Sequence, residues 1–187
     1  MAIVSVPVEK SYRLLNIGPT TLVSAKADNI ENVMAVAWSC ALDYGPLSKV
    51  TTVLDKQAFT RGLVEKSGLF AIQIPVASQA ELVLKLGSTS RHTDPHKLEN
   101  VEIFYQDGFD IPLVKGCAGW ILCELIRNQE NQQEHDLFIG KVLAAYADDR
   151  VFKDNHWIFE QASNELRTLH YVAGGQFYLI GESLDIK

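Results

Sequence analysis

The chain has 187 residues, of which 47% are hydrophobic and 21% charged, and its formal net charge is −6. This composition is typical of a single globular domain over residues 1–187, and the negative charge argues against a uniformly basic nucleic-acid surface. The three cysteines form no CxxC motif, and Cys40 and Cys123 lie in apolar runs. They argue against a disulfide framework and favour buried, reduced thiols.

The opening residues, MAIVSVPVEKSYRLL, lack the basic start and the long apolar run of a signal peptide. No segment approaches the ~20 consecutive apolar residues that a membrane span requires. We therefore expect a cytoplasmic protein without a membrane partner.

The first third of the chain predicts three strands and a helix. Thr20–Lys26 is rich in β-branched residues and is followed by the turn Asp28-Asn29, so Asn32–Leu42 is expected to pair with it. Ser48–Leu54 alternates as a third strand does. Phe59–Gly68 carries apolar residues at helical spacing and ends at a glycine, which predicts a short helix.

The middle of the chain continues with a strand and a second helix. LFAIQIP, residues 69–75, reads as a strand closed by proline. Ser78 is expected to cap a helix that Gly87 ends, with Glu81 at the capping-box position. Residues 88–110 are rich in Ser, Thr, His, Asp and Pro and predict irregular structure.

The last part of the chain predicts three more strands. Residues 118–128 and 135–149 form two long strands, and the polar run Arg127–Asp136 is interpreted as their hairpin tip. Residues 169–181 add a strand interrupted by Gly174-Gly175. About seven strands, mostly successive, with two short helices indicate a mainly β protein with a closed or split antiparallel barrel.

The stretch Asn32–Leu42 has an uneven size pattern. Because side chains alternate along a strand, the bulky residues fall on one face and the small ones on the other, namely Val33, Ala35, Ala37, Ser39 and Ala41. The bulky face, with Met34 and Trp38, is expected in the barrel core. The small face is expected to receive either a helix, a dimer partner or a planar ligand.

Two polar segments are candidate anion sites. Leu54–Arg61 runs from a strand into a helix start, where free N–H groups and the positive charges of Lys56 and Arg61 suit a phosphate. An ordinary helix start is the alternative, because no glycine-rich phosphate loop is present. The loop Gly87–Lys97 carries further hydroxyl and basic side chains. No recognisable set of metal ligands or catalytic motif occurs, so we expect no metal.

Several segments together resemble the flavin reductase-like, FMN-binding split-barrel family, which includes flavoredoxins and the reductase components of two-component monooxygenases. They occur in the family's order and span most of the chain. The segments are NVMAVAW (32–38), the turn ending in Phe59-Thr60, FAIQIP (70–75), the loop 87–97, HDLFIGKV (135–142) and YVAGGQFY (171–178).

The resemblance implies a Greek-key split β-barrel that forms a homodimer, with FMN bound near the subunit interface. It places the flavin ring against Ala37, Trp38, Ser39 and Cys40. It places the phosphate at the turn formed by Leu54, Asp55, Lys56, Ala58, Phe59, Thr60 and Arg61. It closes the site with a loop that contains Ser90, Arg91, His92 and Lys97.

The implied activity is hydride transfer from NADH or NADPH to the flavin, which requires no protein acid or base. Two alternatives are a flavoredoxin-like FMN carrier that exchanges electrons with another protein without direct use of NADH or NADPH, and a split-barrel binding protein that has lost flavin. A monooxygenase is expected as a possible redox partner. The sequence departs from the family in three places. Ala58 stands where relatives often carry Arg or Lys, the loop 90–97 is altered, and Asp43-Tyr44 replaces a proline-containing strand end.

Overall fold

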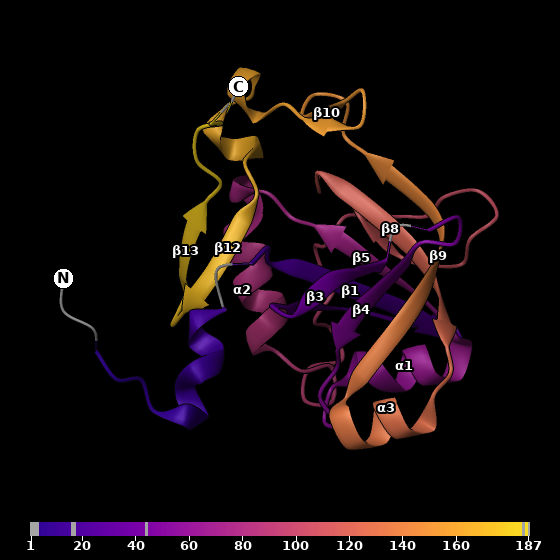
Figure 1. Ribbon diagram of the computed structural model, residues 1–187. Coiled ribbons are helices and arrows are strands. Elements are labelled where there is room, and N and C mark those ends of the chain that lie inside the picture. Colours follow the sequence, from indigo (N-terminus) through magenta and orange to yellow (C-terminus); the bar gives the residue numbers. More distant parts are fainter. Residues whose placement is uncertain (1–3, 16–17, 44, 185, 187) are drawn as a thin grey trace.

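A curled, seven-stranded antiparallel sheet forms the centre of the molecule (Figure 1). The structure is a computed structural model and describes residues 4–15, 18–43, 45–184 and 186. The strand order is β2-β1-β5-β8-β9-β4-β3. The bounds are β1 Thr21–Ala27, β2 Ile30–Val36, β3 Ser39–Asp43, β4 Lys49–Val53, β5 Leu69–Ile74, β8 Gly119–Ile126 and β9 Leu137–Ala147.

Smaller elements surround this sheet. Three two-stranded ribbons are β6–β7 (Ile103–Phe104, Leu113–Val114), β10–β11 (Phe152–Lys153, His156–Trp157) and β12–β13 (Leu169–Ala173, Gln176–Leu179). The α-helices in the described residues are α1 (Phe59–Ser67), α2 (Ala80–Ser88) and α3 (Gln129–His135). Short 3-10 turns are Val8–Leu14, Ala77–Gln79, Phe159–Gln161 and Asn164–Leu166. None of the described helices is long and apolar enough to cross a membrane.

The chain connection between β2 and β3 explains why the sheet curls. These strands lie at opposite edges of the sheet, yet β2 ends at Val36 and β3 begins at Ser39. Three Cα–Cα steps span at most about 11 Å. The two edges must therefore approach each other at Ala37 and Trp38, which gives the mainly β half-barrel that the sequence predicts.

Two apolar cores meet at strand β2. The barrel core contains Val36 and the fully buried Phe70 and Phe138, and helix α1 closes one end of it. A second core lies between α2 and the outer face of the sheet and includes Val33 and Leu86. Strand β2 is thus covered on both faces over part of its length.

Gly140 shows how tightly the barrel core is packed. A Cβ atom at this position would lie 2.5 Å from Cζ of Phe70 and 2.9 Å from Cβ of Cys123. Because atoms cannot approach that closely, only glycine lets the Phe70 ring fill the space beside β9. The glycine of the HDLFIGKV segment therefore has a packing role.

The structure corrects the reading of Asn32–Leu42 as one strand. It divides at Ala37 and Trp38 into β2 and β3. Trp38 is 48% exposed and Leu42 50% exposed, so the expected bulky core face ends at Val36. Cys40 is also exposed, and the prediction of a buried thiol is wrong for it. Tyr44, where the sequence departs from the family pattern at the end of this segment, lies outside the described residues.

Cys117 and Cys123 do meet the expectation of buried thiols. Burial raises the pKa of each thiol to about 12. Both side chains therefore stay protonated at neutral pH and unreactive as nucleophiles.

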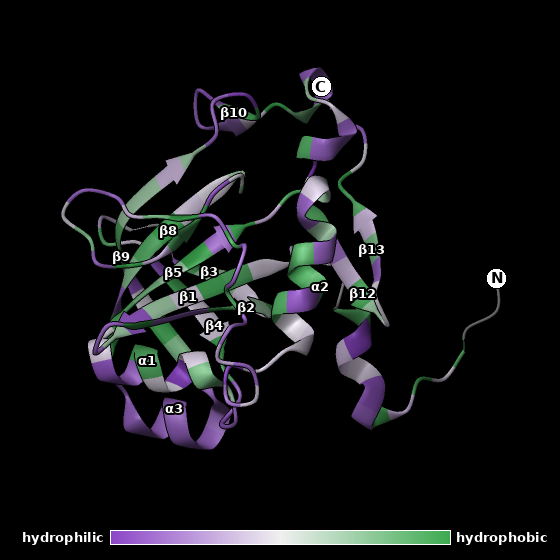
Figure 2. Cartoon of the chain, turned by 180° about the vertical axis from the view of Figure 1, so that it is seen from behind, coloured by the Kyte–Doolittle hydropathy of each residue, from purple (hydrophilic) through white to green (hydrophobic). Residues whose placement is uncertain are grey.

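Three further expectations about secondary structure were wrong in detail. The polar tip between β8 and β9 forms helix α3, which Figure 2 shows as almost uniformly hydrophilic. Helix α2 begins at Ala80, and its N-cap residue is Gln79, which makes no side-chain capping hydrogen bond, so the expected Ser78 cap is not formed. The C-terminal strand is a hairpin whose turn, Gly174-Gly175, has φ angles of 60° and 83° that glycine adopts readily.

Candidate functional site

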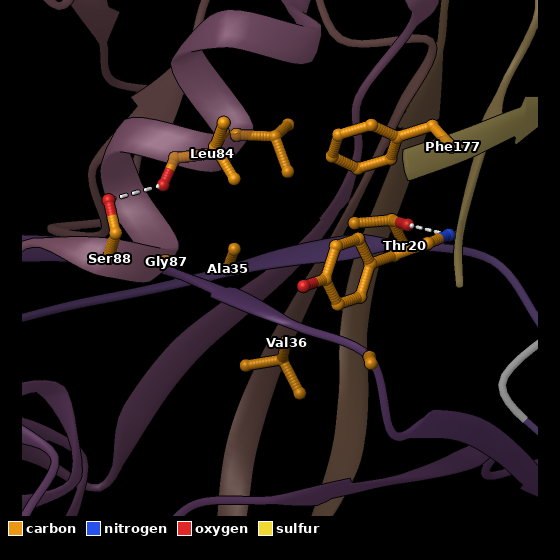
Figure 3. Close-up of a pocket in the computed structure, with 10 residues that line it drawn as sticks. Thr20, Ala35, Val36, Leu84, Gly87, Ser88 and Phe177 are labelled. Atoms are coloured by element: carbon orange, nitrogen blue, oxygen red, sulfur yellow. Dashed lines mark hydrogen bonds between the residues drawn. The ribbon is translucent and has the colours of Figure 1, made fainter. Parts of the chain in front are cut away.

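An apolar cavity lies where the end of β2, helix α2 and the β12–β13 hairpin meet (Figure 3). Its volume is about 250 Å³. Most of its wall is aliphatic or aromatic, and the residues that form it are Thr20, Ala35, Val36, Ala37, Val83, Leu84, Gly87, Ser88, Tyr171 and Phe177. Such a composition suits a flat and largely apolar ring.

Thr20 fixes the β12–β13 hairpin beside this cavity. Its N–H group donates to the carbonyl oxygen of Leu169 at 2.8 Å, and its hydroxyl accepts from the N–H group of Tyr171 at 2.8 Å. The rings of Tyr171 and Phe177 then lie 5.2 Å apart, one from each strand of the hairpin. Two aromatic side chains that are distant from β2 in sequence thereby become its neighbours.

Small residues let helix α2 approach the small face of β2. A Cβ atom on Gly87 would lie 3.3 Å from Cβ of Ala35, which is closer than ordinary contact. The small face therefore receives a helix at Ala35, one of the outcomes that the size pattern left open. Farther along, at Ala37, the same face borders the apolar cavity.

A second, polar cavity adjoins the first, with Ala35, Gly87 and Ser88 in both walls. Its volume is about 290 Å³. It lies between β2, the start of α1 and the loop after α2. Its other wall residues are Asn32, Met34, Asp55, Gln57, Ala58, Phe59, Thr60, Leu86, Thr89, Ser90, Arg91 and Lys97.

Asn32, a wall residue of this second cavity, has a buried polar atom without a hydrogen-bond partner among the described residues. The side chain is 1% exposed, and its Nδ2 donates to Oγ1 of Thr60 at 2.9 Å. Its Oδ1 has no hydrogen-bond partner among the described residues. Because a buried polar group without a partner costs free energy, this atom indicates a ligand that hydrogen-bonds there.

The start of helix α1 adds backbone donors to the same cavity. The residue before the helix, Ala58, supplies no capping side chain. The N–H groups of Phe59 and Thr60 lie in the first turn, where no earlier helical carbonyl is available to accept from them. Together with the positive end of the helix dipole they favour an anion. Binding of a phosphate at this turn stays a prediction.

Two basic side chains line the polar cavity. Arg91 is half-buried and donates to the backbone carbonyl of Glu31. Lys97 is 2% exposed, and its Nζ donates to the carbonyl oxygen of Leu86 at 2.9 Å. Burial, and to a lesser extent the nearby charge of Arg91, lowers the pKa of Lys97 to about 8. A bound anion would stabilise the charged form of this lysine.

Three expected flavin-site residues, two from the phosphate turn and one from the closing loop, line a different cavity. Lys56, Arg61 and His92 surround a third hollow, which meets the polar cavity at Ala58 and Phe59. Arg61 is 4% exposed and donates to the carboxylates of Asp136 and Glu65 and to the carbonyl oxygens of Leu54 and Gln132. Its guanidinium thus joins α1 to α3 and points away from the polar cavity.

The remaining expected turn residues divide between the core and the polar cavity. Leu54 is fully buried in the barrel core and does not line the cavity. Asp55 lies at the cavity wall, where its carboxylate accepts from the N–H group of Gln57 at 2.7 Å. Ser90 of the loop also lines this cavity.

Only one of the four residues expected beneath the flavin ring lines the apolar cavity, namely Ala37. The ring of Trp38 lies edge-on to that of Tyr12, with centroids 5.7 Å apart. The hydroxyl of Ser39 is hydrogen-bonded to those of Thr21 and Thr52 at 2.9 and 3.0 Å. Cys40 lies exposed on β3.

The sequence reasoning missed several residues at the two cavities. Asn32 is the first residue of the segment Asn32–Leu42. The sequence pattern does not distinguish a buried amide from an exposed polar residue at the end of a strand. Tyr171 and Phe177 belong to the segment 171–178, which carried the resemblance without a role. The available signal was that both aromatic residues flank the turn glycines Gly174-Gly175, which is typical of a hairpin that brings two rings together.

The sequence profile described as "Flavin reductase like domain" matches residues 15–176. The chain belongs to the flavin reductase-like family. Within that family's pattern, the matched region contains β2, helices α1 and α2 and the hairpin strand β12, and thus most of the walls of both cavities.

Three similar proteins are consistent with this family assignment. YddH of Escherichia coli (strain K12), an uncharacterized protein, is 34% identical over 183 residues, which are 95% of each chain. The crystal structure of an FMN-binding domain of a flavin reductases-like enzyme from Shewanella baltica OS155 has 50% identity and a TM-score of 0.89, covering 98% of this chain and 97% of that one.

The flavoredoxin of Methanosarcina acetivorans is 18% identical, with a TM-score of 0.75, and the match covers 90% of this chain and 87% of that one. At that identity the likeness concerns the fold alone. With the Shewanella structure, it confirms the predicted mainly β, split-barrel architecture.

Proposed function

We propose that this protein is an FMN-binding oxidoreductase that takes hydride from NADH or NADPH. The flavin ring lies in the apolar cavity and the ribityl phosphate in the polar cavity. The single observation that carries the proposal is the buried Oδ1 of Asn32, which lacks a partner at the junction of strand and cavity. A ribityl hydroxyl is a donor of the kind that this atom requires.

The two cavities match the two chemical halves of FMN. The apolar cavity offers Ala35 and Ala37 beneath a flat ring and the aromatic side chains of Tyr171 and Phe177 beside it. The polar cavity offers hydroxyl groups, helix N–H groups and cations to a phosphate. We assign the phosphate to Thr60, Arg91 and Lys97, with the backbone of Phe59.

This assignment leaves the redox chemistry to the cofactor and positioning to the chain. When bound, FMN would supply the chemistry of hydride acceptance from a nicotinamide and of electron transfer to an acceptor. The chain holds the ring against the backbone near Ala37 and excludes water with the Tyr171 and Phe177 side chains. It holds positive charge at Arg91 and Lys97 against the phosphate dianion.

Anaerobic reduction of the purified protein tests this function. FMN should raise the melting temperature, because a ligand that binds the native state stabilises it. NADH or NADPH should then bleach the yellow protein within seconds. A melting temperature that FMN leaves unchanged would instead support a split barrel that has lost flavin.

An electron carrier of the flavoredoxin type is the second candidate, and the fold that the chain shares with a flavoredoxin is compatible with it. In that case the flavin stays oxidised when NADH or NADPH is added and is reduced only by a protein donor. A monooxygenase is the partner class that we expect as acceptor for the reductase. Addition of either nicotinamide nucleotide therefore separates the two functions in one measurement.

We also propose a homodimer, as the family resemblance implies. Trp38 and Leu42 are about half exposed, and Trp38 directly follows Ala37, a wall residue of the apolar cavity. Exposed apolar side chains next to a ligand site are typical of subunit contacts. Sedimentation should give twice the mass of one chain, and Trp38→Asp should shift it towards one chain.

A further inference from the structure

The phenol hydroxyl of Tyr171 is a donor without a partner in the wall of the apolar cavity. Three hydroxyl groups belong to this wall, those of Thr20, Ser88 and Tyr171. The Thr20 hydroxyl accepts from the N–H group of Tyr171, and the Ser88 hydroxyl donates to the carbonyl oxygen of Leu84 at 2.8 Å (Figure 3). The Tyr171 hydroxyl makes no hydrogen bond with any described residue. It is therefore available to a ligand.

The register of the β12–β13 hairpin turns Tyr171 toward the cavity. Tyr171 lies directly opposite Phe177 in the hairpin, so the two side chains leave the same face. Figure 3 shows the ring of Phe177 extending from β13 toward Leu84 of helix α2. Tyr178 pairs with His170 on the opposite face and is 59% exposed. The pleat thus separates two tyrosines of one hairpin, and the cavity wall includes Tyr171 but not Tyr178.

Contacts on both sides of the hairpin fix the position of Tyr171. On one side, the two backbone hydrogen bonds of Thr20 hold β12 at Leu169 and Tyr171. On the other side, a Cβ atom on Gly175 would lie 3.7 Å from Cδ2 of Leu84, which is ordinary contact between the turn and α2. A donor that is already held in place loses little conformational entropy when a ligand binds.

Charge is absent from the described wall of this cavity, which contains only aliphatic, aromatic, glycine and hydroxyl residues. A flavin ring that gains a hydride receives two electrons and one proton, and so carries one additional negative charge. Hydrogen bonds to a charged acceptor are roughly twice as strong as those to a neutral one, and weak screening in an apolar site strengthens them further. A fixed donor beside the ring therefore stabilises the reduced form more than the oxidised form.

We propose that Tyr171 donates a hydrogen bond to the flavin ring and thereby raises its reduction potential. This inference rests on the proposed FMN site. The hydroxyl favours the reduced over the oxidised flavin by about tenfold, which corresponds to about 30 mV for a two-electron couple. Tyr171 is thus a residue that tunes the potential, whereas Phe177, its neighbour in the same wall, supplies apolar contact alone.

Spectroelectrochemical titration of the full chain loaded with FMN tests the proposal. Tyr171→Phe removes the hydroxyl and keeps the ring. The midpoint potential should fall by about 30 mV, the tenfold loss of preference for reduced flavin, while affinity for oxidised FMN falls less than fivefold. The melting temperature of the flavin-free variant should stay unchanged, because the hydroxyl has no partner among the described residues.

Tyr178→Phe is the matched control, since it makes the same change on the outer face of the same hairpin. It should leave the midpoint potential, the FMN affinity and the melting temperature unchanged. An equal fall in potential in this control overturns the inference, because the effect would then not come from the cavity wall.

The other contrary results are equally definite. An unchanged or raised midpoint potential in Tyr171→Phe overturns the inference and leaves the FMN site in place. A more than tenfold loss of affinity for oxidised FMN also overturns it, because the hydroxyl would then serve binding rather than the potential. Absence of FMN binding by the unaltered protein overturns the proposed function and this inference with it.

Discussion

The substitution Asn32→Leu tests whether the Asn32 amide binds the ligand or only stabilises the fold. The side chain is buried and makes one hydrogen bond to Thr60, while its Oδ1 has no partner among the described residues. Leucine has a similar size and removes both polar atoms. The flavin-free protein therefore loses one hydrogen bond of about 1 kcal/mol and is relieved of an unsatisfied group that costs about 1–3 kcal/mol.

The substitution is expected to leave the flavin-free protein as stable as before or slightly more stable, and to weaken the complex with FMN. The flavin-free form of Asn32→Leu should melt at or slightly above the unaltered protein. Loss of one or two ligand hydrogen bonds of about 0.5–1.5 kcal/mol each should weaken FMN binding by about 2- to 160-fold. Thermal melts without flavin and fluorescence titration with FMN measure both quantities.

Gln73 is the matched control, because it is a fully buried amide with both ends satisfied. Its Nε2 donates to Ser24 at 2.8 Å, and its Oε1 accepts from the N–H group of Val114 at 2.6 Å. Gln73→Leu should lower the melting temperature of the flavin-free protein, since two buried partners lose their bonds. The reasoning is refuted if Asn32→Leu behaves in the same way and leaves FMN affinity unchanged.

Three other predictions concern the two cavities. Ala37→Leu should fill the apolar cavity and lower FMN affinity at least tenfold with little change in the melting temperature of the flavin-free protein; tight binding by this variant would place the ring elsewhere. Thr60→Ala with Lys56→Ala should weaken FMN binding more than tenfold, and the separate variants should assign the loss to Thr60, since Lys56 lines the third cavity. FMN affinity should fall as pH rises through about 8, where Lys97 loses its proton, and Lys97→Met should remove that dependence in titrations from pH 7 to pH 9.5.

As pH rises, Lys97 should increase the stability of the flavin-free protein, whereas it should decrease the affinity for FMN. The pKa of this lysine is lowered from 10.5 to about 8 in the folded, flavin-free protein. Between these values the unfolded chain binds more protons, so the free energy of unfolding attributable to Lys97 rises with pH. Flavin-free protein should thus gain stability from this group while it loses affinity for FMN.

The sequence was most informative where a local pattern has a local cause. The turn Asp28-Asn29 joins β1 to β2, and Gly68 ends α1 in the left-handed conformation. Both follow from backbone preferences of single residues. The polar tip at α3 was misjudged because a short helix of polar residues has no apolar face to reveal its period.

The residues of the candidate site were only partly predictable for the same reason. The turn before α1 was found because strand and helix signals adjoin in sequence. The opposite wall of the apolar cavity, Tyr171 and Phe177, comes from a hairpin more than 130 residues after β2, which is held there by hydrogen bonds of Thr20 and by packing against α2. No periodicity in β2 contains that information.

The sequence alone determined a mainly β chain, the position of its first helix and a strand whose small face required a close neighbour. The tertiary structure decided which segment or cavity lies against each residue of that small face. Ala35 meets Gly87 of α2, whereas Ala37 borders an open cavity. It also decided that Arg61 is a buried link between helices and Lys97 a cavity cation. Charge and size are properties of a residue, but the partner that they meet is set by the packing of distant segments.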